Sequence, residues 1–302
     1  MIGAALTTQG LVKRYGRRRA LDGFTLSVPQ GALMGLVGPN GAGKTTWMMT
    51  VAGFLRPSAG VVDILGRGPF DARLHAGRFS ILPQDSELPL EAHVAGLLIR
   101  YARLAGLSAT AARSAVSDIL AAVNLSDRAT STIRSLSHGM RKRVMLAQCF
   151  LGSPEIILLD EPLNGLDPVE RDRIRNFILS FRGKRTIVVS SHELHDVEYL
   201  CSHVAFVEKG RVARTSVLSA LTRASRRVTY GLTCEPVDYS ALVQALPGTE
   251  FSWDGRGKVL VCTVPTDDLA AANRVLLPVL LCQTDILSIT AGQSLEDAYL
   301  NR

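Results

Sequence analysis

Short apolar runs alternate with amphipathic stretches along most of the chain, and this pattern predicts strands followed by helices in an α/β sheet. Residues 33–37 form an apolar run that enters a Gly-rich turn, with a helical stretch after it. Residues 156–159 and 186–189 are further runs that are too apolar for strands with one solvent-exposed face. A long helical tract is expected over roughly residues 90–152, with Ser108 as the N-cap of one helix.

The pattern changes near residue 220, and a smaller second domain is predicted after it. The expected strands are residues 228–233, 249–253, 258–264 and 285–290, and the expected helices are residues 239–246 and 267–281. This order, with a tight turn at residues 254–257, is similar to a split β-α-β layout. A last helix is expected to open at Ser294. We therefore predict one domain at residues 1–222 and a small α+β domain at residues 223–302.

The turn after residues 33–37 matches the phosphate-loop pattern GxxxxGK[ST] in full, from Gly38 to Thr45. Glycines let backbone N–H groups converge on phosphate oxygens, and the positive end of the following helix points at them. Lys44 can reach the outer phosphates, and the Thr45 hydroxyl can bind Mg²⁺. A chance Gly-rich turn does not explain the strand before it and the helix after it. The predicted ATP-binding residues of this loop are Gly38, Pro39, Asn40, Gly41, Ala42, Gly43, Lys44, Thr45 and Thr46.

A second apolar strand delivers two adjacent carboxylates, Asp160 and Glu161, at its C-terminal edge. An aspartate in this place holds the magnesium shell, and a neighbouring glutamate can polarise the attacking water. Two acids at a strand end can instead cap the next turn, but the phosphate loop favours the catalytic interpretation. The sequence therefore predicts hydrolysis of ATP as well as binding.

The overall composition limits the possible partners and cell compartments of the chain but suggests no further catalytic groups. A net charge of +7 suits nucleic acid, an anionic membrane surface or a phosphate-rich ligand, but the basic clusters are short and lack interleaved aromatics, so solvated faces are the simpler interpretation. The five scattered cysteines form no CxxC pair and are expected to be buried in a reducing cytosol. No secretory signal is visible, and the longest apolar stretch, residues 275–282, is far below the roughly 20 residues that cross a bilayer.

Four further elements decide which phosphate-loop family the chain resembles. Gln84 follows an apolar segment, Leu136-Ser-His-Gly-Met140 precedes a basic helix, Asn164-Gly-Leu-Asp167 follows the carboxylates, and His192 follows the strand at residues 186–189. With these motifs in order and at the usual spacing, residues 5–220 resemble the nucleotide-binding subunit of an ABC transporter. The resemblance implies a phosphate-loop NTPase core of ABC type, with a mixed sheet and a helical subdomain at about residues 86–150.

The resemblance also implies roles for single residues. Tyr15 would stack on adenine, although a solvated tyrosine is the alternative. Gln84 would touch Mg²⁺ or water and relay the nucleotide state to a membrane partner, Asp167 would bridge the two active sites of a dimer, and His192 would hydrogen-bond the γ-phosphate. His192 and His195 lack a third ligand, so a histidine metal site is not expected. The predicted catalytic residues are Gln84, Glu161 and His192, and the predicted metal ligands are Thr45, Gln84 and Asp160.

The signature element departs from LSGGQ, the commonest form in the family. His138 and Met140 replace a glycine and the glutamine, while Ser137 and Gly139 remain. In the family, this serine hydroxyl and glycine N–H bind the γ-phosphate of ATP held by the opposite subunit, so binding across a dimer is expected. The replacement by His138 is expected to affect the rate of ATP hydrolysis and not the ability to hydrolyse ATP. Met140 with its basic neighbours, and a tail at residues 294–300 that is similar to one in many exporter subunits, favour export; a plain amphipathic helix is the other interpretation of the tail.

The leading interpretation is an ATPase subunit that powers a separately encoded membrane permease. Two copies, or this chain and a homologue, would sandwich two ATP on the cytoplasmic face of the inner (plasma) membrane. The permease is expected to contact the surface near Gln84 and residues 91–105. The runner-up, a soluble ABC-type ATPase acting on ribosomes or nucleic acid, usually has a second nucleotide domain or a coiled-coil insertion, which this sequence lacks. A regulator that closes without hydrolysis conflicts with Glu161 and His192.

Overall fold

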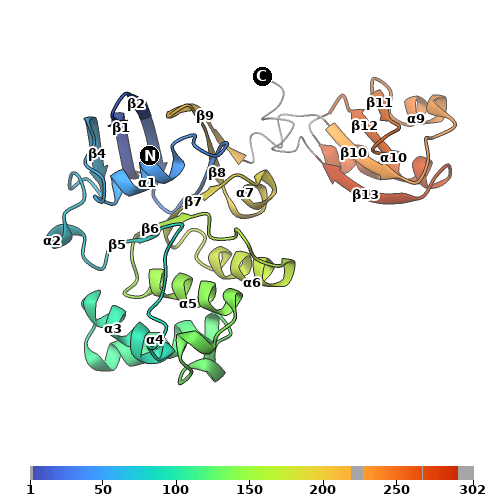
Figure 1. The fold of residues 1–302 in the computed structure, drawn as a ribbon. Coiled ribbons are helices and arrows are strands. Elements are labelled where there is room, and N and C mark those ends of the chain that lie inside the picture. Colours follow the sequence, from blue (N-terminus) through green and yellow to red (C-terminus); the bar gives the residue numbers. More distant parts are fainter. Residues whose placement is uncertain (1–2, 219–226, 267, 292–302) are drawn as a thin grey trace. The chain divides into compact units, whose positions relative to one another are not determined.

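The computed structural model describes residues 3–218, 227–266 and 268–291 (Figure 1). The chain divides into two compact units, Met1–Thr215 and Ser216–Arg302. The predicted domain boundary near residue 222 and the predicted terminal helix at Ser294 lie outside the described residues. No helix in the described ranges is both long and apolar enough to cross a membrane.

The first unit is built around a six-stranded sheet in the order β5-β6-β7-β3-β8-β9. Strands β5 to β8 in this order pair in parallel, and β3, β6 and β7 are buried at every position, as expected for a sheet covered on both faces. The three strands predicted from apolar runs are therefore confirmed. The strands are β3 (Leu33–Val37), β5 (Phe79–Leu82), β6 (Ile156–Asp160), β7 (Thr186–Ser191), β8 (His203–Glu208) and β9 (Arg211–Val217).

A second sheet in this unit was not predicted. It has the order β2-β1-β4 and is antiparallel, with β1 (Ala4–Tyr15), β2 (Arg18–Pro29) and β4 (Ala59–Ile64). The β1–β2 pair contains several register shifts, which break the alternation of apolar and polar residues that marks a strand. Helix α1 (Lys44–Val51) packs here through Trp47, whose ring stacks on Phe24 at 5.6 Å.

The remaining helices of the first unit include the predicted helical tract (Figure 1). Ser108 caps α4 by accepting a hydrogen bond from the Ala111 N–H at 3.2 Å, as predicted. The helices are α2 (Ala72–His75), α3 (Val94–Leu104), α4 (Ala109–Ala122), α5 (His138–Phe150), α6 (Pro168–Leu179) and α7 (Leu194–Leu200), with short 3₁₀ turns at Ser126–Arg128 and Ile133–Ser135.

The second unit is a four-stranded antiparallel sheet in the order β11-β12-β10-β13, with its own buried core. Strand β12 lies between β10 and β11, which α9 connects, so the split β-α-β layout is confirmed. Alternate residues of β10, such as Tyr230, are buried and belong to the same core as Leu276 of α10. The elements are β10 (Arg227–Leu232), α9 (Tyr239–Ala245), β11 (Glu250–Asp254), β12 (Val259–Thr263), α10 (Leu269–Leu281) and β13 (Ile286–Ala291).

The cysteines only partly match the sequence interpretation. Cys149, Cys201 and Cys262 are buried, but Cys234 and Cys282 are exposed, so the prediction of five buried cysteines was wrong. Cys234 follows the end of β10 and Cys282 caps the end of α10, where the chain leaves the core. All five thiols are free.

Candidate nucleotide-binding site

The phosphate loop is the turn between β3 and α1, and its glycines are required by close backbone contacts. A Cβ atom on Gly38 would lie 2.1 Å from the Val207 carbonyl oxygen. Gly43 has φ +112 and caps α1, and a Cβ atom there would lie 2.8 Å from the Ala20 carbonyl oxygen. The Gly210 N–H donates to the Ala42 carbonyl at 2.8 Å and fixes the loop against the β8–β9 turn. The loop is therefore held in one curled conformation.

Lys44 is buried at the first position of α1. Its ammonium donates to the carbonyls of Gly38 at 2.6 Å and Pro39 at 3.3 Å, and lies 3.9 Å from Glu161 Oε1. Burial lowers the pKa of Lys44, and the carboxylates of Glu161 and Asp160 oppose that shift. The ammonium thus lies between the phosphate loop and the acidic pair, where it can meet the outer phosphates of a nucleotide.

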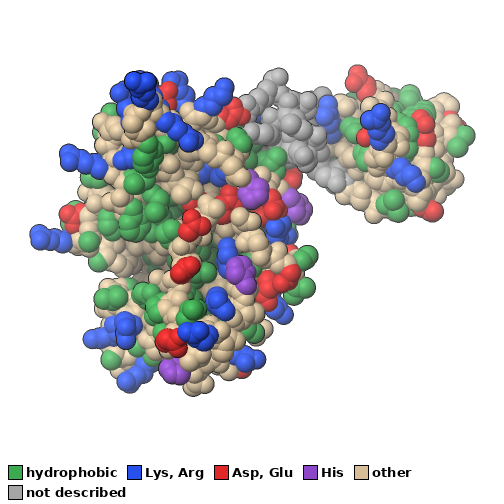
Figure 2. Space-filling view, viewed as in Figure 1, with side chains coloured by type: hydrophobic (Ala, Val, Ile, Leu, Met, Phe, Trp, Pro, Cys, Tyr) green, Lys and Arg blue, Asp and Glu red, His purple; other side chains and the backbone are tan. Residues whose placement is uncertain are grey.

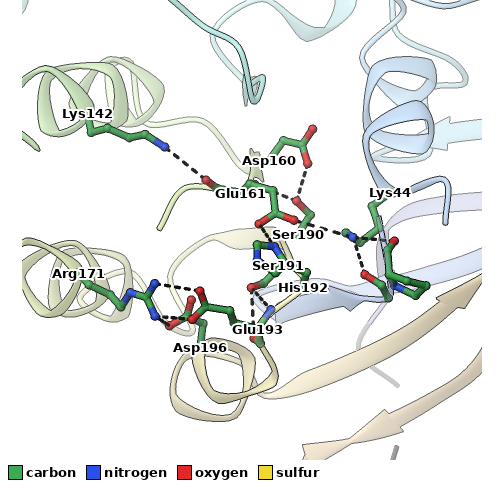
Figure 3. Close-up of polar contacts among 12 residues, drawn as sticks. Lys44, Lys142, Asp160, Glu161, Arg171, Ser190, Ser191, His192, Glu193 and Asp196 are labelled. Carbon is green, nitrogen blue, oxygen red and sulfur yellow. Dashed lines mark hydrogen bonds and ion pairs between the residues drawn. The ribbon is translucent and has the colours of Figure 1, made fainter. Parts of the chain in front are cut away.

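The two acids at the end of β6 are held by Ser190 of β7 (Figure 3). The Ser190 hydroxyl donates to Asp160 Oδ1 and accepts the Glu161 N–H at 2.9 Å. Glu161 has φ +49, a left-handed conformation that costs energy for a residue with a Cβ. Such strain persists only where neighbouring contacts fix it, and here the Glu161 side chain points toward His192 (Figure 3).

Two further contacts define the surroundings of Glu161. His192 follows β7, and its Nδ1 lies 2.9 Å from Glu161 Oε2. Lys142 of α5 reaches the Glu161 carbonyl at 3.5 Å, and burial lowers the pKa of that lysine (Figure 3). Glu161 is 7% exposed, so its side chain is largely shielded from bulk water.

A cavity of about 510 Å³ opens over the loop, and most of the predicted site lines it. Arg18, Ala20 and Asn164 also line the cavity but were not among the predicted site residues. Asn164 lies within the motif quoted after the carboxylates, and Arg18 within the basic stretch after Tyr15. The predicted residues in the lining are Tyr15, Asn40, Gly41, Ala42, Gly43, Lys44, Thr45, Thr46, Gln84, Glu161 and His192.

Three predicted residues lie at the exposed starts of helices, apart from the cavity lining. Ser137 caps α5 by accepting the Met140 N–H at 3.2 Å, and Gly139 is in the first turn of the same helix. Asp167 caps α6 by accepting the Glu170 N–H at 3.0 Å. Ser137 and Asp167 are both exposed. The chain alone therefore does not bring these residues to its own phosphate loop.

The loop, the buried lysine and the two acids meet at the carboxyl ends of parallel strands, which is where α/β proteins bind their ligands. The class of protein is a phosphate-loop nucleoside triphosphatase. The comparisons with known proteins identify the family more narrowly. The sequence profile of the ABC transporter family matches residues 21–164, and the chain belongs to this family as one of its ATP-binding subunits.

The related proteins cover most of the chain. Daunorubicin resistance ATP-binding protein DrrA3 of Streptomyces coeruleorubidus is 33% identical over 283 residues, which are 91% of this chain and 88% of that protein. Nod factor export ATP-binding protein I of Burkholderia orbicola (strain AU 1054) is 36% identical over 213 residues, 69% of each chain. A solved ATP-binding subunit of an ABC transporter is 26% identical with a TM-score of 0.65, and the match covers 72% of this chain and 91% of that one.

Family membership confirms the main sequence predictions. The fold is the mixed α/β cassette of the ABC ATPases, the ligand is a nucleotide, and the chain is an ATPase that energises a separate membrane permease. The soluble ribosome- or nucleic-acid-directed alternative is not supported.

Proposed function

We propose that this chain is the ATP-hydrolysing subunit of an exporter and forms half of a dimer with two shared ATP sites. The dimer is proposed because the predicted ATP-binding residues lie on two separate surfaces of the chain. The phosphate loop and Glu161 line the cavity, whereas Ser137 and Asp167 are exposed at helix starts away from it. In this arrangement, Ser137 and Gly139 of one subunit bind the γ-phosphate held by the other, and Asp167 bridges the two sites.

Magnesium fits the polar groups at this site. Asp160 Oδ2 is buried without a hydrogen-bond partner among the described residues, which leaves a carboxylate oxygen for a cation. Carboxylate, hydroxyl and amide oxygens are the ligands that Mg²⁺ accepts. Asp160, Thr45 and Gln84 would hold the ion, which when bound neutralises charge on the phosphates.

The residues around the cavity have separate roles in binding and hydrolysing ATP. Tyr15 stacks on adenine, and Lys44 binds the outer phosphate oxygens in place of the carbonyls that it now contacts. Glu161 polarises the attacking water and accepts its proton. His192 holds Glu161 through Nδ1 and leaves Nε2 for a γ-phosphate oxygen. The strained backbone of Glu161 fixes its direction, so little reorganisation is needed at the moment of reaction.

The family and the relatives support a proposal for where the chain works in the cell. We propose a peripheral position on the cytoplasmic face of the inner membrane, with the permease contacting the surface near Gln84 and α3. Export is proposed because both relatives above carry names of export or drug-resistance proteins. Lys and Arg side chains form separate groups on the visible face of the first unit rather than one continuous patch, which is unlike a nucleic-acid surface (Figure 2). Residues 1–222 would form the ATP-binding domain and residues 223–302 an accessory domain.

Steady-state ATPase measurements with Mg²⁺ and the membrane partner test this function. Glu161→Gln keeps the shape of the side chain but removes the base, so we expect kcat to fall by roughly 100-fold or more while ATP still binds. Glu155→Gln is the matched control, because Glu155 directly precedes the opposite end of β6. A Glu161→Gln protein that turns over at the wild-type rate, or a wild type without turnover, would contradict the proposal.

A further inference from the structure

The first turn of α6 carries two adjacent charged residues that are tied to two different parts of the site. We propose that Glu170 and Arg171 are positioning residues that couple the signature helix α5 to the loop of His192, and so couple the two ATP sites of the dimer. The proposal rests on the proposed function, since α5 acts on the partner's ATP and His192 on the subunit's own.

Glu170 anchors the start of α5. Its carboxylate pairs with Arg143 of α5 (Nε to Oε2, 2.8 Å), and Arg143 in turn donates to the carbonyls of Val123 at 2.7 Å and Asn124 at 3.0 Å. Gly139 lies directly against Glu170, because a Cβ atom there would be 2.9 Å from Glu170 Cγ. The Glu170 side chain therefore lies where a shift of the signature at Gly139 would meet it.

Arg171 anchors the His192 loop (Figure 3). Its guanidinium makes a bidentate contact with the Glu193 carboxylate, with Nη2 to Oε1 at 3.0 Å, and lies 3.8 Å from Asp196. Glu193 is the residue after His192, and its N–H donates to Ser191 Oγ at 3.0 Å. Bidentate pairing fixes direction as well as distance. Hydrogen bonding from Arg171 also holds the pKa of the Glu193 carboxyl below its ordinary value.

Both ion pairs are made by residues in the first turn of α6, which backbone and side-chain hydrogen bonds to Asp167 hold in place. The Arg171 N–H donates to the Asp167 carbonyl at 2.9 Å, and the Glu170 N–H donates to the Asp167 carboxylate. The Glu170–Arg143 side chains are 15% and 5% exposed, so solvent screens this pair weakly. When α5 closes on the partner's ATP, the displacement passes through this turn of α6 to Glu193 and His192.

A double-mutant cycle on kcat tests the coupling in the full chain with its membrane partner. Glu170→Gln loosens the tie to α5 and Glu193→Gln loosens the tie to Arg171, and neither residue lines the cavity. Each single change should lower kcat roughly 10-fold and leave the Kd for Mg-ATP within about 2-fold. Because both act on one path, the double variant should lose far less than the product of the single losses. Arg171→Met should reproduce the Glu193→Gln loss.

Glu155→Gln provides the control, because its ion pair with Arg78 lies at the opposite end of β6. Glu155→Gln should not change kcat. In the double variant with Glu193→Gln, the factors by which the two single changes alter kcat should multiply. Single-variant kcat values close to wild type, or losses of Glu170→Gln and Glu193→Gln that multiply, would overturn the coupling while wild-type turnover still supports the proposed function. A wild type without turnover would overturn both. Loss of ATP affinity together with thermal stability would indicate a structural lesion and also count against the coupling.

Discussion

The Ser190 hydroxyl contacts both acids at the end of β6. It satisfies the Glu161 N–H and one oxygen of Asp160, and it is fully buried. Ser190→Ala leaves both groups without this partner. Burying an unsatisfied polar group costs roughly 1–3 kcal/mol, so we expect a loss of that size in the free energy of unfolding, together with a lower kcat.

Denaturant unfolding and steady-state turnover measure these two effects. Ser180→Ala is a suitable control, because that hydroxyl donates one hydrogen bond to a backbone carbonyl (Phe177, 2.7 Å) and lies exposed at the end of α6, away from the two acids. If Ser190→Ala matched the control in both stability and kcat, the role assigned to Ser190 would be wrong.

Ser190 also shows where prediction from the sequence stops at the residue scale. Lys44, Glu161 and His192 belong to motifs whose order and spacing are visible in one chain, and the structure places all three around one cavity. Ser190 is an ordinary serine in a strand, and its importance follows only from the pairing of β6 with β7. Arg18 was missed for a similar reason, because a basic residue in a basic stretch usually faces solvent.

At the scale of elements, buried strands were easier to predict than twisted antiparallel ones. Strands β3, β6 and β7 are continuous apolar runs because the sheet is covered on both faces. Strands β1 and β2 contain register shifts that interrupt their alternation, so the hairpin that carries Tyr15 was not predicted. Helix α6 was likewise not predicted as an element, and its importance lies in the ion pairs of its first turn rather than in its apolar face.

The Arg171–Glu193 pair between α6 and the His192 loop predicts a pH dependence of stability. The pKa of Glu193 is lowered from its ordinary value of 4.5 in the folded chain. At pH values between the lowered and the ordinary pKa, the unfolded chain therefore binds more protons than the folded chain. The stabilisation is complete above the ordinary carboxyl value and is lost as pH falls through the lowered value. Arg171→Met should therefore reduce the fall in Tm between about pH 5 and about pH 3.

Thermal unfolding of wild type and Arg171→Met across that range provides the measurement. Arg78 lowers the pKa of Glu155 in both proteins, so Glu155 should contribute the same change in Tm with pH to both curves. The difference between the curves then reports the Arg171–Glu193 pair. Parallel curves for the two proteins would show that the pair does not stabilise the fold.

At the scale of the whole molecule, the two units have separate cores, and all described residues that line the cavity belong to the first. Leu260 is fully buried in the second core. Leu260→Ala should destabilise the second unit by about 2–5 kcal/mol, because it leaves a cavity, and it should leave ATP affinity unchanged. Denaturant unfolding and ATP titration check both parts. Weaker ATP binding in this variant would mean that the nucleotide site depends on the second core.

In the proposed mechanism, one chain holds only half of each ATP site. Sedimentation of the Glu161→Gln variant with and without Mg-ATP tests it directly, because that variant is expected to bind ATP and to hydrolyse it very slowly. We expect a monomer without nucleotide and a dimer with Mg-ATP, and we expect Ser137→Ala in the same background to remain monomeric. A Glu161→Gln protein that binds Mg-ATP and stays monomeric, or a dimer that is indifferent to Ser137→Ala, would show that the two subunits do not share their ATP sites.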